Sequence, residues 1–217
     1  MPASTAVRNV VRRGPRSDAT ANREALIQAA QSVLAQQPNA SLVTIAQAAG
    51  LSRRALYGHF PDREALIKAV VEHGAQKFND IAESTEHADP RVALALLAAR
   101  LWREASAVRA SANIALDDAH VADTARALAP LRQRLRVLTE AGVADGSFRR
   151  DLSPAVLAYL VEEAARTTLR GRSSSGDFAS GELAAAAGTV VRVVLSIVGL
   201  GWVEQVELIE AHPEVLG

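Results

Sequence analysis

Cysteine is absent from the 217 residues of this chain, and methionine occurs only once. The absence of cysteine excludes a thiol nucleophile, a thiolate zinc site and a disulfide framework, and it fits a reducing cytoplasm. The chain also lacks a P-loop, a GxGxxG fingerprint and an HExxH pair. Asp117 and His120 lie one helical turn apart, but two weak ligands are more typical of a solvated helix face than of a metal site. We therefore expect no enzymatic activity, no metal and no cofactor.

A long uncharged apolar run is also missing. The most apolar segment, residues 183–203, is interrupted by Arg192, which leaves 9 and 11 uncharged residues on its two sides. A membrane-spanning helix needs about 20 such residues. The N-terminal segment has no apolar core of the kind that a secretory signal requires. We expect a cytoplasmic protein that does not cross a membrane.

The chain has no net charge, because 24 basic residues balance 24 acidic ones, and this argues against a general polyanion binder. The charge is nevertheless segregated. Residues 1–63 carry eight arginines and three acidic residues, a net charge of +5. A positive end is typical of a protein that contacts phosphates. The first 21 residues, with four arginines among proline, glycine and serine, predict a disordered basic leader that is either a solubilising tail or a minor-groove arm.

The most informative window is Ser41–Phe60, SLVTIAQAAGLSRRALYGHF. It predicts two short helices joined by a tight turn. Gly50 follows the last residue of the first apolar stripe, where a helix end favours the left-handed conformation that glycine reaches without steric cost. Ser41 and Ser52 are good N-caps for the two helices.

The second helix of this window has an inward and an outward side. Leu56 and Phe60 lie four residues apart and are expected to anchor it. At 100° per residue, Arg54 and Gly58 then point away from the anchored face. An arginine beside a glycine on an exposed helix suits close approach to a DNA groove, where bidentate arginine–guanine pairing is the commonest specific contact. A plain helical hairpin within a bundle is the alternative.

These residues resemble the tetracycline-repressor (TetR) family of regulators over about 50 residues, from Asn22 to Val71. The resemblance rests on the turn and on the YGHF-PDREALI segment that follows it. It implies phosphate contacts by Tyr57, His59 and Arg63, base contacts by Arg53, Arg54 and Ala55, and further DNA contacts by Ser41, Val43 and Thr44. Gly58 stands where the family usually has a larger side chain. For three of these residues a structural role stays open, with Tyr57 packed, His59 as a polar cap and Arg63 paired with an acid.

Helical periodicity continues along the chain without β alternation, so we expect an all-α fold. The three parts are the leader (1–21), a helix-turn-helix DNA-binding head (22–66) and a larger helical body for ligand binding and dimerisation (67–217). The expected helices outside the window are Asn22–Ala35, Asp62–Ile81, Pro90–Val108, Ser111–Ala119, Asp123–Val143 with a bend at Pro130, Pro154–Arg170 and Glu182–Val203. Between the last two we expect a loop, Gly171–Gly181.

The last two helices are apolar on more than one face, which predicts cover from more than one side. A two-fold four-helix interface would supply it, and the resemblance implies a homodimer of this kind. A core helix within one chain is the alternative. Two recognition helices in a dimer would match a palindromic double-stranded operator.

The body predicts a site for a small-molecule effector. The candidate ligand-binding residues are Phe78, Trp102, Asn113, Asp117 and His120, each of which is alternatively an ordinary core or surface residue. The sequence thus favours a ligand-responsive repressor. The other hypotheses are a helical small-molecule-binding protein without regulatory DNA binding, and a nonspecific DNA-architecture protein, against which the zero net charge argues.

Overall fold

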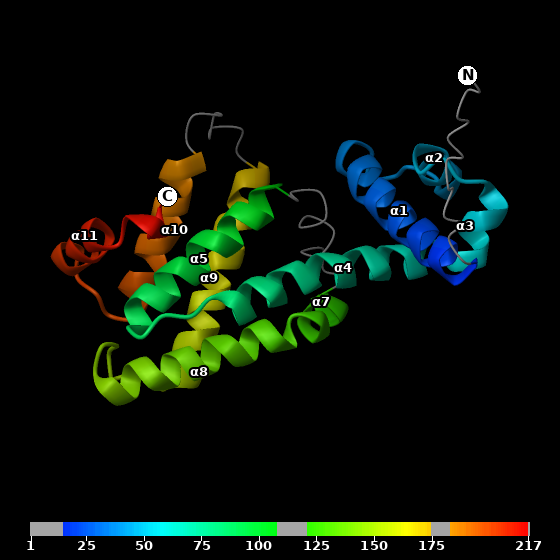
Figure 1. Cartoon of the computed structure of the whole chain (residues 1–217). Coiled ribbons are helices and arrows are strands. Elements are labelled where there is room, and N and C mark those ends of the chain that lie inside the picture. The colour runs from blue at the N-terminus through cyan, green and yellow to red at the C-terminus, as the bar shows by residue number, and fades with distance from the viewer. Residues whose placement is uncertain (1–14, 108–120, 175–182, 217) are drawn as a thin grey trace, which may run out of the picture. The chain divides into compact units, whose positions relative to one another are not determined.

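A computed structural model describes residues 15–107, 121–174 and 183–216 (Figure 1). All regular elements in these ranges are helices, which confirms the all-α prediction. They are α1 (Pro15–Gln36), α2 (Leu42–Ala48), α3 (Arg53–His59), α4 (Arg63–Ser84), α5 (Pro90–Ala107), α7 (Val121–Ala127), α8 (Ala129–Asp145), α9 (Pro154–Ser174), α10 (Leu183–Ile197), α11 (Trp202–Ala211) and a 3-10 turn (Pro213–Val215).

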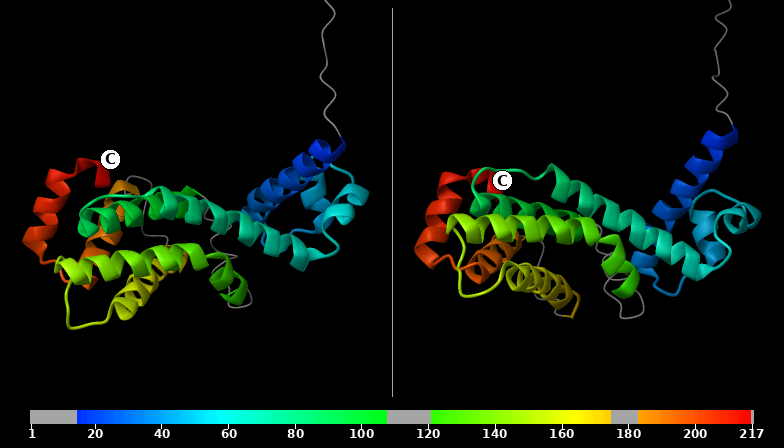
Figure 2. Two further views of the ribbon diagram at one scale, coloured as in Figure 1. Left: turned by 60° about the horizontal axis from the view of Figure 1, so that its bottom comes forward. Right: turned by 90° about the horizontal axis from the view of Figure 1, so that it is seen from below.

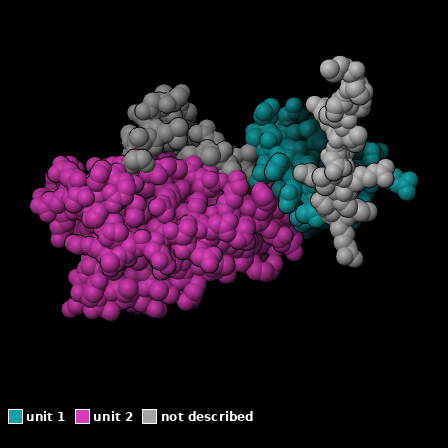
Figure 3. All heavy atoms as spheres, in the orientation of Figure 1, with its two compact units in different colours: residues 1–66 teal, residues 67–217 magenta. Residues whose placement is uncertain are grey.

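The chain divides into two compact units, unit 1 (Met1–Leu66) and unit 2 (Ile67–Gly217), which Figure 3 colours separately. Unit 1 holds α1, α2, α3 and the first residues of α4. Unit 2 holds the remainder of α4 and every later helix. Each unit is built on its own set of buried side chains.

Helix α1 begins earlier than the sequence predicted. Its first residue is Pro15, so residues 15–21 are helical and do not belong to a disordered leader. Proline is favoured at the first helical position, and Asp18 in the first turn interacts favourably with the helix dipole. These local signals outweigh the loop-like composition. The rest of the predicted leader, residues 1–14, lies outside the described residues.

Unit 2 is organised around α5. All eight residues from Val92 to Ala99 are buried, so this helix is apolar on every side. Such a helix must be covered all round. Helices α8, α9 and α10 pack against it, and α9 and α10 also pack against each other, as the views of Figures 1 and 2 show. The sequence analysis identified the last two long helices as apolar on more than one face and missed the central position of α5.

Pro130 breaks the helix that was expected over Asp123–Val143. Proline lacks the N–H that would continue the helical ladder, and its ring clashes with the carbonyl four residues earlier. The chain therefore forms α7, passes through Leu128 at φ −91° and ψ 13°, and restarts as α8 with proline in its first turn. The interruption is a complete break rather than the predicted bend.

Gly199 ends the helix that was expected to continue to Val203. Its φ of +105° lies in the left-handed region that favours glycine, and α10 stops at Ile197. Helix α11, which the sequence analysis did not predict, begins at Trp202, where Glu204 accepts a 2.7 Å hydrogen bond from the Gly201 amide. Helix α9 continues to Ser174 and so includes the start of the predicted loop Gly171–Gly181, whose remainder lies outside the described residues.

Within the described residues, no helix is long and apolar enough to span a bilayer.

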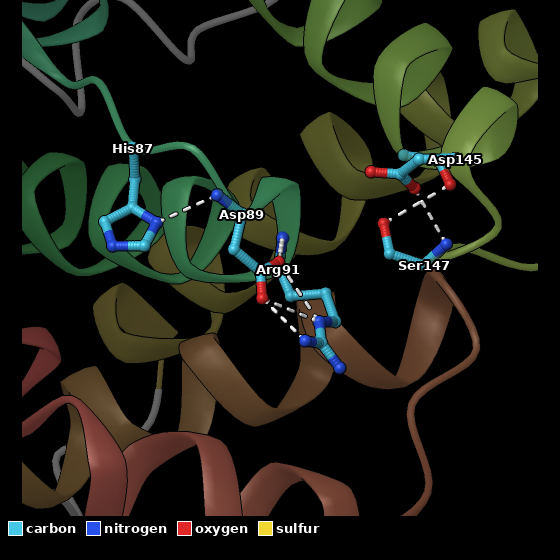
Figure 4. Close-up of polar contacts among 6 residues, drawn as sticks. His87, Asp89, Arg91, Asp145 and Ser147 are labelled. Atoms are coloured by element: carbon cyan, nitrogen blue, oxygen red, sulfur yellow. Dashed lines mark hydrogen bonds and ion pairs between the residues drawn. The ribbon is translucent and has the colours of Figure 1, made fainter.

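Asp89 caps the N-terminus of α5 (Figure 4). One carboxylate oxygen accepts a 2.8 Å hydrogen bond from the Arg91 amide, and Pro90 occupies the first helical position. The same carboxylate accepts bonds of 2.6–3.1 Å from the Arg91 guanidinium. The hydrogen bond from the Arg91 side chain lowers the pKa of Asp89. At the C-terminal end of α8, hydrogen bonds from the side chain and the amide of Ser147 lower the pKa of Asp145.

We predict that Asp89→Ala lowers the free energy of unfolding by about 1 kcal/mol, the usual cost of losing an N-cap. A group whose folded pKa is depressed stabilises the protein above its unfolded pKa and ceases to do so as the pH falls through the folded value. The difference between wild type and variant in urea unfolding should therefore be full at pH 7 and shrink at pH 3.

Asp89→Asn is the matched control, because asparagine keeps the cap and loses the ion pair. An Asp89→Ala variant as stable as wild type at pH 7, or a difference that grows toward low pH, would contradict this role.

Candidate nucleic-acid interface

Helices α2 and α3 form a helix-turn-helix pair. The Ser41 hydroxyl accepts a 3.1 Å hydrogen bond from the Thr44 amide at the start of α2, and Ser52 does the same for Ala55 at the start of α3. Gly50 has a φ of +68°, which places it in the left-handed region between the helices. Both predicted caps and the predicted glycine turn are thus present in the geometry.

The inward side of α3 is fixed by two buried side chains. Leu56 is 0% exposed and Phe60 is 3% exposed. Helix α3 packs on α1 and α2, where Ile45 and Ala46 are also buried. The guanidinium of Arg23 lies 5.3 Å from the centre of the Phe60 ring, a cation–π contact that the sequence analysis missed. Because the inward side is fixed, the rotation of α3 about its axis is fixed as well.

The outward side of α3 carries Arg53 and Arg54, two of the three residues for which the resemblance implies base contacts. Arg53, Arg54, Tyr57 and Gly58 are exposed, and Ala55 is half-buried. The Arg53 guanidinium lies 5.4 Å from the centre of the Tyr57 ring. Arg54 makes no hydrogen bond or ion pair within the part of the chain that the structure describes. A Cβ added at Gly58 would meet nothing within 4 Å, so this side is open.

The residues predicted at the start of α2 are only partly free. Val43 is 36% exposed. The hydroxyls of Ser41 and Thr44 are 2.9 Å apart and hydrogen-bonded to each other. At the end of α3, His59 is half-buried, with its ring centre 6.5 Å from that of Phe60. Ser41 and Thr44 therefore contribute to the cap of α2, whatever they contact in addition.

Arg63 lies at the first position of α4 and turns toward the loop between α1 and α2. Its Nη2 donates a 2.5 Å hydrogen bond to the carbonyl of Pro38, and its Nη1 donates to the carbonyl of Ala40. The predicted phosphate ligand is thus occupied with two backbone acceptors of unit 1. The sequence alternative that paired Arg63 with an acid is not what the structure shows. Neighbouring Asp62 caps α4 through a 2.8 Å bond from the Ala65 amide.

Unit 2 contains a cavity of about 170 Å³ whose wall is mostly apolar. Phe78 of α4 and Trp102 of α5 line it, whereas Asn113, Asp117 and His120 lie outside the described residues. Other lining residues come from α7, α8, α9 and α10, and the charged ones are Arg132, Glu162 and Arg166. Among the described residues, no group of three histidine, aspartate or glutamate side chains is placed to hold a metal ion.

The helix-turn-helix region matches known proteins. The family model described as "Bacterial regulatory proteins, tetR family" matches residues 26–70. The HTH-type transcriptional repressor LfrR of Mycolicibacterium smegmatis is 38% identical over 69 residues. The likeness to the TetR family therefore concerns the helix-turn-helix region of this chain. The match to LfrR covers 31% of this chain and 34% of LfrR, so it spans about a third of that curated relative.

Solved structures show the same fold over most of the chain. FadR from Bacillus halodurans has a TM-score of 0.69 and 19% identity, over 82% of this chain and 99% of that one. FadR from Bacillus subtilis, in complex with stearoyl-CoA, has a TM-score of 0.70 and 16% identity over the same shares. RolR in complex with resorcinol has a TM-score of 0.59 and 20% identity, over 89% of this chain and 95% of RolR. At these identities the likeness shows a shared fold alone.

The charged residues of the cavity were missed by the sequence analysis. Glu162 and Arg166 lie four residues apart on α9, on the side of the helix where Leu157 and Val161 are buried. A charged pair at that spacing, beside an apolar stripe, was the available signal. The sequence analysis missed this pair because helical periodicity is judged from the apolar positions and takes no account of charged residues between them.

We predict that Arg63→Lys lowers the thermal unfolding midpoint of the chain. Lysine keeps the positive charge but cannot donate simultaneously to the carbonyls of Pro38 and Ala40 with a planar guanidinium. The lost bonds should cost about 1–2 kcal/mol. Arg54→Lys is the control, because Arg54 has no such partners among the described residues, and it should leave the midpoint unchanged. An Arg63→Lys variant of full stability but weakened DNA binding would instead identify Arg63 as a phosphate contact.

Proposed function

We propose that this chain is a transcriptional regulator that binds a palindromic DNA operator as a homodimer and releases it when a small molecule binds in unit 2. Because the effector would release the protein from its operator, we propose that the protein acts as a repressor. The proposal rests chiefly on Arg54, an exposed guanidinium without a protein partner in the described structure, on a helix whose rotation is fixed. Arginine presented in this way pairs with the O6 and N7 of guanine in the major groove.

The other residues proposed to contact DNA differ in whether their side chains already have partners within the protein. Arg53 and Tyr57 lie against each other on the exposed side of α3, where they can contact a base edge and a phosphate respectively. Ser41, Val43 and Thr44 would contact DNA from α2, with Ala55, Gly58 and His59 beside them. Arg63 would act mainly by holding the loop before α2, since its guanidinium already has two acceptors.

A homodimer is supported by apolar side chains exposed on α9 and α10. Val156, Tyr159 and Leu160 of α9 are 42%, 60% and 37% exposed, and Val193 of α10 is 37% exposed. These neighbouring helices would form a four-helix contact with a second copy. The two-fold arrangement would present two α3 helices to two half-sites of one operator.

The proposed effector site is the cavity of unit 2. Helix α4 contributes Val70, Gly74 and Phe78 to its wall, and the same helix begins in unit 1 with Arg63 and Leu66. A molecule that fills the cavity would shift α4 and alter the spacing of the α3 helices. To weaken operator binding about 100-fold, it must favour the non-binding arrangement by about 3 kcal/mol.

We predict that Arg54→Ala abolishes specific binding in a band-shift experiment with the DNA upstream of the chain's own gene. Loss of a bidentate arginine contact costs about 1–3 kcal/mol in each half-site. Arg150→Ala is the matched control, because Arg150 is an exposed arginine of unit 2, and it should bind like wild type. Binding that is indifferent to DNA sequence, or unaffected by Arg54→Ala, would contradict the proposal.

We predict that Leu160→Glu converts the dimer to a monomer, because it places a charge in an apolar interface. The mass in solution, measured by light scattering after size exclusion, should fall by half. Val137→Glu is the control, since Val137 is 43% exposed on α8 and lies outside the proposed interface. A dimer that survives Leu160→Glu and dissociates with Val137→Glu would place the interface elsewhere.

A further inference from the structure

Two ion pairs stand at one side of the cavity of unit 2. The Nε of Arg132 lies 2.9 Å from both carboxylate oxygens of Glu162, and its Nη2 lies 2.5 Å from one of them. Its Nη1 donates to the carbonyl of Ala125 at 3.1 Å. One turn further along α9, Arg166 is paired with Glu163. Each of the three nitrogens of the Arg132 guanidinium therefore donates to an acceptor, and both carboxylates have a cationic partner.

Three of these charged residues line two hollows. One is the mostly apolar cavity of about 170 Å³, and the other is a groove of about 280 Å³ lined by residues of α8 and α9. Arg132, Glu162 and Arg166 line both. A ligand that occupies the cavity and the groove together would pass directly beside the Arg132–Glu162 pair.

The groove has an excess of positive charge. Its charged lining residues are Arg132, Arg136, Arg166, Glu162 and Glu163, a net charge of +1. Arg136 is exposed, and its side chain has no ion pair within the described residues. The Nε of Arg166 is buried and has no hydrogen-bond acceptor in the described part of the chain. The groove thus offers the unpaired cation of Arg136, whereas its carboxylates are already engaged.

We propose that the effector is an amphiphile with a single negative charge, with a compact apolar body in the cavity and a carboxylate in the groove beside Arg136 and Arg166. This assignment rests on the proposed function of unit 2 as the effector-binding part. A carboxylate suits the site because guanidinium groups bind it through strong charge-assisted hydrogen bonds. A cationic head would face three arginines and would have to displace one of them from its carboxylate.

The size of the cavity sets the size of the apolar body. An apolar cavity of about 150 Å³ accommodates one benzene ring. The 170 Å³ cavity therefore fits one ring or a short branched chain. Phe78 and Trp102 on its wall can pack against such a ring.

The inference is tested with three probes that share one body: 4-phenylbutanoate, 4-phenylbutan-1-ol and 4-phenylbutan-1-amine. Their affinities for the full chain are measured by titration calorimetry with wild type, Arg136→Gln and Arg150→Gln. We expect the butanoate to bind tightest. Arg136→Gln should reduce the preference for butanoate over butanol about fivefold, because one charge-assisted bond is lost. Arg150→Gln, which removes the same charge from unit 2 outside the groove, should preserve that preference.

Equal affinities for the three probes, tightest binding of the amine, absence of binding by all three, or a preference unaffected by Arg136→Gln would each overturn the inference. Operator binding is measured in the presence of the same probes, so that a failure of the anion site can be distinguished from a failure of operator release. Selective butanoate binding that leaves operator affinity unchanged would support the anion site and refute the proposed release. Operator release by the butanol as strongly as by the butanoate would support release and refute the anion preference.

Discussion

The burial of Leu56 and Phe60 is the constraint on which the proposed DNA reading depends. Helix α3 has only seven residues, and an isolated helix of that length does not form in water. Its stability therefore comes from packing on α1 and α2, from the Ser52 cap and from the turn at Gly50. The same buried pair decides which residues face outward. If these two side chains did not hold α3, no direction could be assigned to Arg54.

The arginines of unit 1 have different structural roles, and the net charge of the unit does not reveal them. Arg23 lies over the ring of Phe60, and Arg63 binds the carbonyls of Pro38 and Ala40. Arg53 lies over the ring of Tyr57. Of the arginines in the described part of unit 1 whose side chains are placed, Arg54 is the one without such a partner. Positive charge in this unit thus stabilises the fold as well as attracting a polyanion.

The sequence predicted the helix-turn-helix because its signals are local. The caps at Ser41 and Ser52 and the left-handed Gly50 each depend on only a few neighbouring residues, and all are found in the structure. The break at Gly199 was missed because the surrounding residues are uniformly apolar and periodicity continues through it. The contacts of Arg63 and the pairing of Arg132 with Glu162 join residues 23 to 30 positions apart, and no short pattern in the sequence records them.

The account is tested most directly at the base that Arg54 is proposed to read. Replacing a guanine of the operator with 7-deazaguanine removes the N7 acceptor and leaves base pairing intact. A double-mutant cycle between this change and Arg54→Ala measures their coupling. We predict that 7-deazaguanine at one symmetric pair of positions weakens wild-type binding by about 1–3 kcal/mol per half-site and has no further effect on the variant. Additive losses, or no sensitive guanine at all, would contradict the account.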